Sequence, residues 1–150
     1  MSTHNSQKLY RIFVFITALV AIIGFIDALY LTAGYYRPAV LSCDFFQGCQ
    51  AVAKSEYSAV FGIPIALFGS LFYLTFFSSL FLGFNARNKK RFFTFIFLMT
   101  LTGFLISMYL LYLQIYVITA LCIYCLVSLA TSAFLFIFGI VSLIRARNYN

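Results

Sequence analysis

Apolar and polar positions fall in long blocks along this chain. Four apolar blocks cover residues 12–33, 61–84, 92–116 and 122–144, and together they contain a single charged residue, Asp27. Each block is long enough to cross the hydrocarbon core of a bilayer, about 30 Å thick, as an α-helix. The pattern predicts an all-α integral membrane protein, a bundle of four transmembrane helices in one domain that spans residues 1–150.

The composition agrees with a membrane protein and excludes several kinds of chemistry. Hydrophobic residues make up 64% of the chain and charged residues only 9%, whereas a soluble domain is about half apolar and a quarter charged. One histidine and three acidic residues are too few for most metal or haem sites, which need several ligands. We therefore expect no metal, and the four cysteines remain as the reactive groups.

The basic residues predict an orientation in the membrane, because Lys and Arg mark the cytosolic side. Most of the ten basic residues fall on one side of the predicted helices, so we expect both termini to be cytosolic and the protein to lie in the cytoplasmic (inner) membrane. This asymmetry accounts for the net charge of +7, and we expect no nucleic-acid partner. The residues that set the orientation are Lys8, Arg11, Arg87, Lys89, Lys90, Arg91, Arg145 and Arg147.

Two connections are predicted on the outer side: a loop over residues 35–60 and a link over residues 117–121. A loop of this length beside short connections is usually functional. We expect residues 50–58 to form a short amphipathic half-helix that lies on the bundle. Pro64 is expected in the first turn of the second helix, where its missing N–H is tolerated.

All four cysteines are predicted to face the extracytoplasmic side, where disulfides persist. Cys43 and Cys49 lie in the outer loop, and Cys122 and Cys125 form a C-x-x-C motif at the outer start of the last helix. A disulfide within one helical turn closes a very short loop and stabilises little, so the motif favours thiol exchange. Thr119 is the expected N-cap, which puts Cys122 in the first turn, where a thiolate is favoured.

Two other uses of the cysteines are open at this point. Two structural disulfides could staple a non-enzymatic four-helix scaffold. A zinc site of four thiolates is a weaker alternative, because such sites belong mostly to reducing compartments. The resting pairing is also open: Cys43–Cys49 with Cys122–Cys125 and a Cys49–Cys122 link both agree with the sequence.

A loop dithiol opposite a helix dithiol suggests a relay that starts at an outside protein thiol. Exchange passes two electrons at each step through mixed disulfides. Gly48 is expected to give the loop an unusual backbone conformation beside Cys49. No flavin, haem or iron–sulfur motif supplies a final acceptor, so we expect a lipid-soluble quinone in an apolar, aromatic pocket.

Tyrosines and one acid are the candidate quinone contacts. Tyr109, Tyr112 and Tyr116 share one face of the third helix, although an interfacial aromatic belt explains any single tyrosine better. Asp27 costs about 2.5–3.5 kcal/mol in the middle of a membrane helix. Proton delivery to the reduced quinone and a hydrogen bond within the bundle are both open roles for this carboxyl group.

Taken together, these features resemble the vitamin K epoxide reductase family in its stand-alone bacterial form. The resemblance rests on Cys43, Cys49, the segment from Ser55 to Pro64, Gly69 and the motif Cys122-Ile-Tyr-Cys125, and it covers residues 12–144. It implies a four-helix bundle around a quinone, and a quinone-reducing thiol oxidase that supports disulfide bond formation. We expect no fused thioredoxin domain, and hence a separate thioredoxin-fold disulfide oxidase as the partner.

The resemblance also implies a role for each cysteine. Cys43 would meet the reduced partner. Cys49 would resolve that mixed disulfide and then attack Cys122. Cys125 would pass the electrons to the quinone.

The same resemblance places Ser55, Ser58 and Phe61 in the segment over the quinone head group. Vertebrate members have an asparagine in place of Ser58 and a tyrosine in place of Leu129, both linked to quinone or epoxide binding. We therefore expect a ubiquinone- or menaquinone-type acceptor here. The unrelated B-type disulfide-generating oxidase carries its C-x-x-C before its wider cysteine pair, which is the reverse of the order in this chain.

Overall fold

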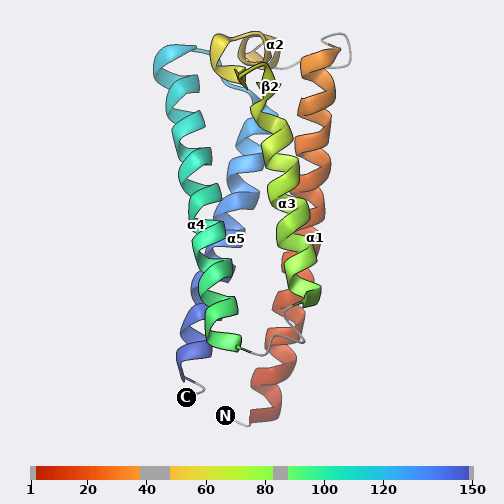
Figure 1. Cartoon of the computed structure of the whole chain (residues 1–150), viewed down its shortest axis with the longest axis vertical. Helices are drawn as coiled ribbons and strands as arrows, with labels where there is room; N and C mark the ends of the chain where they lie inside the picture. The colour runs from red at the N-terminus through yellow and green to blue at the C-terminus, as the bar shows by residue number, and fades with distance from the viewer. Residues whose placement is uncertain (1–2, 38–47, 83–87, 149–150) are drawn as a thin grey trace.

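Four long helices lie side by side in the computed structural model, which describes residues 3–37, 48–82 and 88–148. They are α1 (Thr3–Tyr36), α3 (Ile65–Leu82), α4 (Lys89–Tyr112) and α5 (Ile123–Asn148) (Figure 1). Both chain ends lie at one end of the bundle, and the short elements that connect α1 to α3 cover the other end (Figure 1). The all-α prediction is confirmed.

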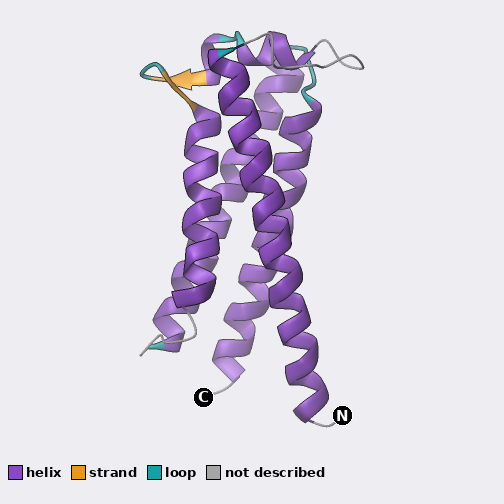
Figure 2. Ribbon diagram, turned by 90° about the vertical axis from the view of Figure 1, so that its right-hand side faces the viewer, coloured by secondary structure: helices purple, strands orange, loops and turns teal. Residues whose placement is uncertain are grey.

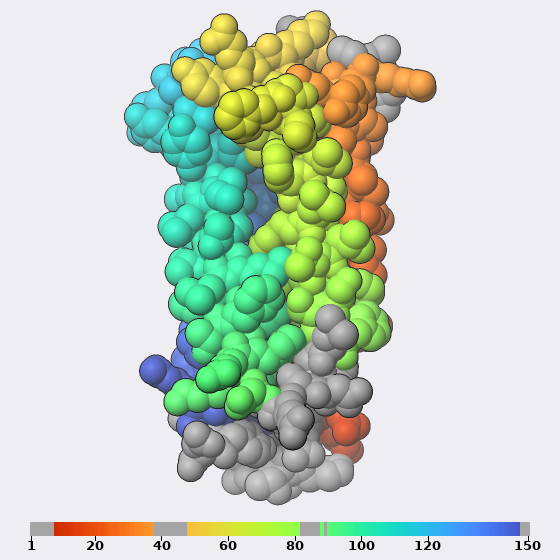
Figure 3. Space-filling model, viewed as in Figure 1, coloured from red at the N-terminus to blue at the C-terminus, as the bar shows by residue number. Residues whose placement is uncertain are grey.

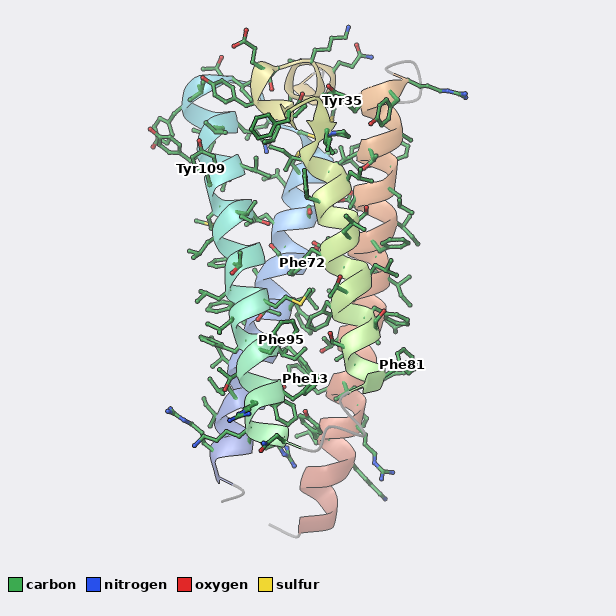
Figure 4. All side chains as sticks on the ribbon, viewed as in Figure 1. Phe13, Tyr35, Phe72, Phe81, Phe95 and Tyr109 are labelled. Carbon is green, nitrogen blue, oxygen red and sulfur yellow. The ribbon has the colours of Figure 1, made fainter. Side chains whose placement is uncertain are left out.

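Three helices are long and apolar enough to cross a membrane: Lys8–Tyr36, Lys90–Val117 and Ile123–Arg147. The fourth, α3, has a shorter apolar stretch over Ile65–Phe81. A fourth membrane crossing therefore stays a prediction. Large apolar side chains project outward along the helices, which suits a lipid environment better than water (Figure 4).

The helices pack in an uneven ring. α1 packs along α3 and α5, and α4 packs along α5, whereas α3 and α4 touch only sparsely. Aromatic side chains from three helices fill the half of the core nearer the termini: the rings of Phe13 and Phe138 are 5.4 Å apart, and those of Phe76 and Phe138 are 6.1 Å apart. In the space-filling view the surface is hollowed between α3 and α4, and α5 is visible at the bottom of the hollow (Figure 3).

The covering elements differ from the single half-helix expected over residues 50–58. They are α2 (Gly48–Ala53), the short 3-10 helix η2 (Glu56–Ser58), and a hairpin of β1 (Ala59–Val60) and β2 (Ile63–Pro64). The hairpin projects from the side of the bundle (Figure 2). Both residues of its turn have positive φ, 52° at Phe61 and 79° at Gly62, as a tight two-residue hairpin turn requires.

The hairpin moves the start of the second long helix. Pro64 pairs with Ala59 in the two-stranded sheet, so α3 begins at Ile65 rather than at residue 61. The prediction that Pro64 lies in the first turn of this helix is therefore wrong. A continuous apolar run does not distinguish a helix from a short hairpin followed by a helix, which explains the error.

The outer end of α4 is also irregular. The helix continues as a π-helical segment, η4 (Leu113–Val117), closed by a hydrogen bond from the Ile118 N–H to the Leu113 carbonyl at 2.8 Å. A short link then leads to α5. π-Helical turns are rare and are often found at functional sites.

Candidate redox site

The C-x-x-C motif lies where the link meets α5. Cys122 immediately precedes the helix and Cys125 lies in its first turn, and both are free thiols. Cys122 is only 1% exposed and Cys125 is partly buried. A hydrogen bond from the Cys125 thiol lowers the pKa of Cys122 below the usual thiol value, although burial acts in the opposite direction. Cys122 is therefore the more nucleophilic thiol of the pair.

The expected N-cap of this helix is absent at Thr119. The Thr119 hydroxyl donates to the carbonyl of Ile118 at 2.8 Å, and its φ is 53°. The Cys122 N–H instead donates to the side-chain oxygen of Gln114 at 3.1 Å. The prediction of Thr119 as N-cap is therefore wrong, because a side chain from η4 takes that place.

Cys49 is held close to the motif by α2. It lies in the first turn of α2, is 1% exposed and is disulfide-bonded. A Cβ built on Gly48 would overlap the backbone carbonyl of Leu121, so α2 packs directly on the link that precedes Cys122. Gly48 has no left-handed φ. Close approach is the reason for this glycine, and the expected unusual backbone conformation is wrong.

Cys43, the other predicted loop cysteine, lies outside the described residues. Its place in the site stays a prediction. Neither cysteine of the helix pair is the disulfide partner of Cys49, since both are free thiols.

The three described cysteines line one cavity of about 230 Å³. Residues from α1, α2, η2, α3, α4, η4 and α5 contribute to its wall, so the cavity lies within the bundle beneath the cover. Most of its surface is apolar. Phe72 lies between α3 and α4 (Figure 4), and its ring packs against Gly103 at the sparsely packed side. Polar lining residues are Tyr35, Ser55, Tyr57, Ser58, Tyr73, Thr102, Ser107, Gln114, Ser128 and Ser132.

Two of the predicted quinone contacts line this cavity. Ser55 and Ser58 follow α2, and both are partly buried. Their hydroxyl groups donate to backbone carbonyls, Ser55 to Val52 and Ser58 to Ser55, each at 2.7 Å. Each hydroxyl oxygen keeps lone pairs with which it can accept a hydrogen bond.

Three predicted contacts lie elsewhere. Phe61 is fully exposed at the hairpin tip, and Tyr112 and Tyr116 are more than half exposed on the outer end of α4 and η4. Among the described residues that line the cavity, none of these three appears. Tyr109 projects from the outside of the bundle (Figure 4), and the exposure of these three side chains agrees with an interfacial aromatic belt. The rings of Tyr112 and Tyr116 contact each other at 5.0 Å.

Asp27 is buried in α1, one residue before the cavity-lining Ala28. Within the described part of the chain, no group forms a hydrogen bond with its Oδ2 atom. Its charge acts on Tyr73 and on both thiols of the motif. The carboxyl group is therefore within electrostatic range of the reactive groups, but it is not among the described residues that line the cavity.

Two residues of the site were not predicted from the sequence. Tyr73 is 2% exposed, and its hydroxyl bonds the Thr131 hydroxyl at 2.6 Å and the Ser128 carbonyl at 3.1 Å. Gln114 is 3% exposed. Gln114 is the only Asn or Gln in the four apolar blocks, and a lone amide in such a block would have identified it. Tyr73 has no comparable signal among so many aromatic residues.

The sequence profile of the vitamin K epoxide reductase family matches residues 15–140, which is most of the chain. The chain belongs to this family. Comparison with individual curated proteins gives no match. Vitamin K epoxide reductases are membrane oxidoreductases that use quinones and generally work with thioredoxin-like partners. Membership confirms the resemblance seen in the sequence and makes this protein a membrane oxidoreductase.

Proposed function

We propose that this protein oxidises the dithiol of a separate thioredoxin-fold partner and passes the electrons to a membrane quinone. The electrons would travel through Cys43 and Cys49 and then through Cys122 and Cys125. In each cycle the partner loses two electrons and two protons and gains a disulfide, and a quinone becomes a quinol. One observation carries the proposal: Cys49, Cys122 and Cys125 line the same apolar cavity.

The transfer between the two pairs is a thiol–disulfide exchange. The Cys49 thiolate attacks the Cys122 sulfur of the helix disulfide, and Cys125 leaves as a thiolate. Cys43 then attacks Cys49, which restores the loop disulfide and frees Cys122. The packing of Gly48 on Leu121 supports this step, because it holds α2 against the link before Cys122. A disulfide-bonded Cys49 beside two free helix thiols is the arrangement that follows it.

The cavity suits the ring of a quinone. Ligand pockets are typically about 300–1,000 Å³, so about 230 Å³ accommodates a small ring system rather than a whole prenylated molecule. The hollow between α3 and α4 offers a way for a tail to reach the lipid (Figure 3). Ser55 and Ser58 lie in the wall as polar groups, and Cys125 is the thiol proposed to deliver the electrons. When bound, a ubiquinone- or menaquinone-type molecule accepts two electrons and two protons.

The arrangement of the bundle supports the proposed orientation. Both termini and most basic residues lie at the end opposite α2 and the start of α5, where the described cysteines are (Figure 1). If basic residues mark the cytosol, the thiols face the extracytoplasmic side of the cytoplasmic membrane. That is where a disulfide oxidase and persistent disulfides are found.

Quinone reduction by the purified protein tests the proposal. The full chain in detergent is mixed with a reduced thioredoxin-fold disulfide oxidase and a short-chain ubiquinone, and absorbance follows quinone loss. Wild type should turn over, and Cys125→Ala should not. Thiol labelling of all four cysteines accompanies each reaction.

Each outcome has a clear meaning. Cysteines that stay unlabelled and a quinone that stays oxidised would refute the proposal and support a scaffold with two structural disulfides. Exchange with the partner without quinone loss would keep the dithiol chemistry and refute the quinone as acceptor. Turnover by Cys125→Ala at the wild-type rate would refute the role of the helix pair.

A further inference from the structure

Gln114 is a buried amide beside the reactive thiols. It lies in η4, and only 3% of its surface is exposed. Burying an amide among apolar groups costs free energy unless its hydrogen bonds are made. Its partners therefore indicate why the chain keeps an amide at this position.

The hydrogen bonds that Gln114 makes to described residues outside its own helical turn lead to the C-x-x-C turn. The side-chain oxygen accepts a hydrogen bond from the Cys122 N–H at 3.1 Å, and the side-chain amide donates one to the Cys125 sulfur. The backbone carbonyl of Gln114 accepts a hydrogen bond from the Ala120 N–H at 3.1 Å. One residue thus holds the link and both cysteines.

These bonds close a ring. Gln114 donates to Cys125, the Cys125 thiol donates to the Cys122 sulfur, and the Cys122 N–H donates back to Gln114. The Cys122 N–H is one of the donors that the start of a helix leaves without a backbone partner. The π-helical turn of η4 carries the Gln114 side chain at the inward position this ring requires, while Tyr112 and Tyr116 face outward.

We propose that Gln114 is a positioning residue that stabilises the reduced form of the Cys122–Cys125 pair. Within the relay proposed above, this makes the helix pair a better acceptor of electrons from the loop pair. A disulfide has no S–H with which Cys125 could donate to Cys122, so only the dithiol can form the complete ring that the Gln114 amide strengthens. A dithiol stabilised in its reduced form raises the reduction potential of the pair.

The test measures the redox equilibrium of the helix pair alone. The full chain with Cys43→Ser and Cys49→Ser retains only Cys122 and Cys125. It is equilibrated in glutathione buffers of graded ratio, and the dithiol is counted by alkylation and mass spectrometry. Neither quinone nor partner is present, so failure here is distinguishable from failure of the proposed function.

Gln114→Met removes both hydrogen-bonding groups at nearly constant size. We expect the equilibrium to shift about tenfold towards the disulfide, which is the upper end of what one net hydrogen bond gives, or about 30 mV. Gln114→Asn keeps an amide that is one methylene too short to reach the sulfur. It should shift the equilibrium in the same direction and covers the case in which Gln114→Met does not fold.

Thr100→Val is the matched control. Thr100 is a fully buried polar residue of α4 whose hydroxyl bonds only carbonyls of the preceding turn, 3.0 Å from those of Ile96 and Phe97. It should leave the redox equilibrium unchanged, whatever it does to thermal stability. Equal equilibria in wild type, Gln114→Met and Gln114→Asn would overturn the proposal, as would the same shift in Thr100→Val.

Discussion

The backbone carbonyl of Leu121 lies so close to the Cα of Gly48 that any Cβ at this glycine would overlap it. Gly48 precedes Cys49, and Leu121 precedes Cys122, so this contact sets the approach of the loop cysteine to the helix cysteine. Because the obstructing atom is backbone, it cannot turn aside as a flexible side chain would. A larger residue at Gly48 must move α2 away from the link.

Gly48→Ala should therefore slow electron transfer between the two cysteine pairs. A displacement of about 1 Å can reduce a positioned reaction about 100-fold. We expect partner-driven quinone reduction to fall by about tenfold or more, while the first exchange with the partner stays fast. Rapid acid quenching and thiol labelling separate these steps.

Gly62→Asn is the control for this substitution. Gly62 lies in the same cover, no atom of the described residues lies within 4 Å of the position that a Cβ would take there, and Asn tolerates its φ of 79°. It should transfer electrons at the wild-type rate. If Gly48→Ala is as fast as Gly62→Asn, the contact with Leu121 does not govern the transfer.

Replacing Cys43 by Ser should trap an intermediate of the relay. Once the helix pair is a disulfide, Cys49 attacks Cys122, and no second loop thiol remains to resolve the link. A Cys49–Cys122 disulfide should then accumulate, and mass spectrometry of digested, alkylated protein would detect it. The control, Cys43→Ser combined with Cys49→Ser, should give no such cross-link. If Cys43→Ser alone accumulates a Cys49–Cys125 disulfide, the assigned roles of the two helix cysteines are reversed.

The reactivity of Cys122 should depend on pH in a way set by Cys125. The hydrogen bond from Cys125 lowers the pKa of Cys122, so the thiolate persists at lower pH than for a free cysteine, whose pKa is about 8.5. The rate of Cys122 alkylation plotted against pH should therefore have its midpoint below that value. In Cys125→Ala the midpoint should rise, and an unchanged midpoint would refute the effect of this hydrogen bond.

Two glycines offer a paired test of the bundle. A Cβ at Gly139 of α5 would overlap the Thr100 hydroxyl and lie 3.3 Å from the Phe97 Cα, whereas one at Gly69 of α3 would meet the Ala28 Cβ at 3.6 Å, an ordinary contact. Gly139→Ala should destabilise the protein by about 1–3 kcal/mol. Gly69→Ala should be neutral or slightly stabilising, because alanine favours a helix. Thermal unfolding in detergent measures both, and equal transitions would contradict the α4–α5 packing.

Some residues of this site could be recognised from the sequence, and others depend on irregular backbone that the sequence does not reveal. The C-x-x-C motif at the start of α5 follows from spacing along the chain, whereas the serines after α2 were predicted only from the resemblance to the family. The capping of Cys122 depends on Gln114 through a π-helical turn, and spacing rules for regular helices favour the nearer Thr119. Phe61 lies in an unbroken apolar run. Hydrophobic periodicity cannot reveal within such a run that the chain forms a hairpin turn with positive φ.

Asp27 is the remaining residue whose role an isosteric substitution can separate. The carboxyl group is buried, its Oδ2 has no hydrogen-bond partner among the described residues, and its charge raises the pKa of Cys122. Asp27→Asn removes the charge and the exchangeable acid at constant size. Without the charge, Cys122 should ionise more readily, so its alkylation at neutral pH should become faster.

Quinone reduction by Asp27→Asn should change in the opposite direction. If the carboxyl group delivers protons to the reduced quinone, its loss should slow turnover by about 100-fold, the low end of the range for a positioned acid or base. Exchange with the partner should continue. Thr17 is another buried polar residue of α1. Thr17→Val serves as the control and should change neither the rate of Cys122 alkylation nor the rate of quinone reduction. A parallel loss of folding, thiol exchange and quinone reduction in Asp27→Asn would instead assign the carboxyl group a structural role. Faster alkylation of Cys122 together with slower quinone reduction would exclude that role, because a purely structural defect cannot accelerate one reaction while it slows the other.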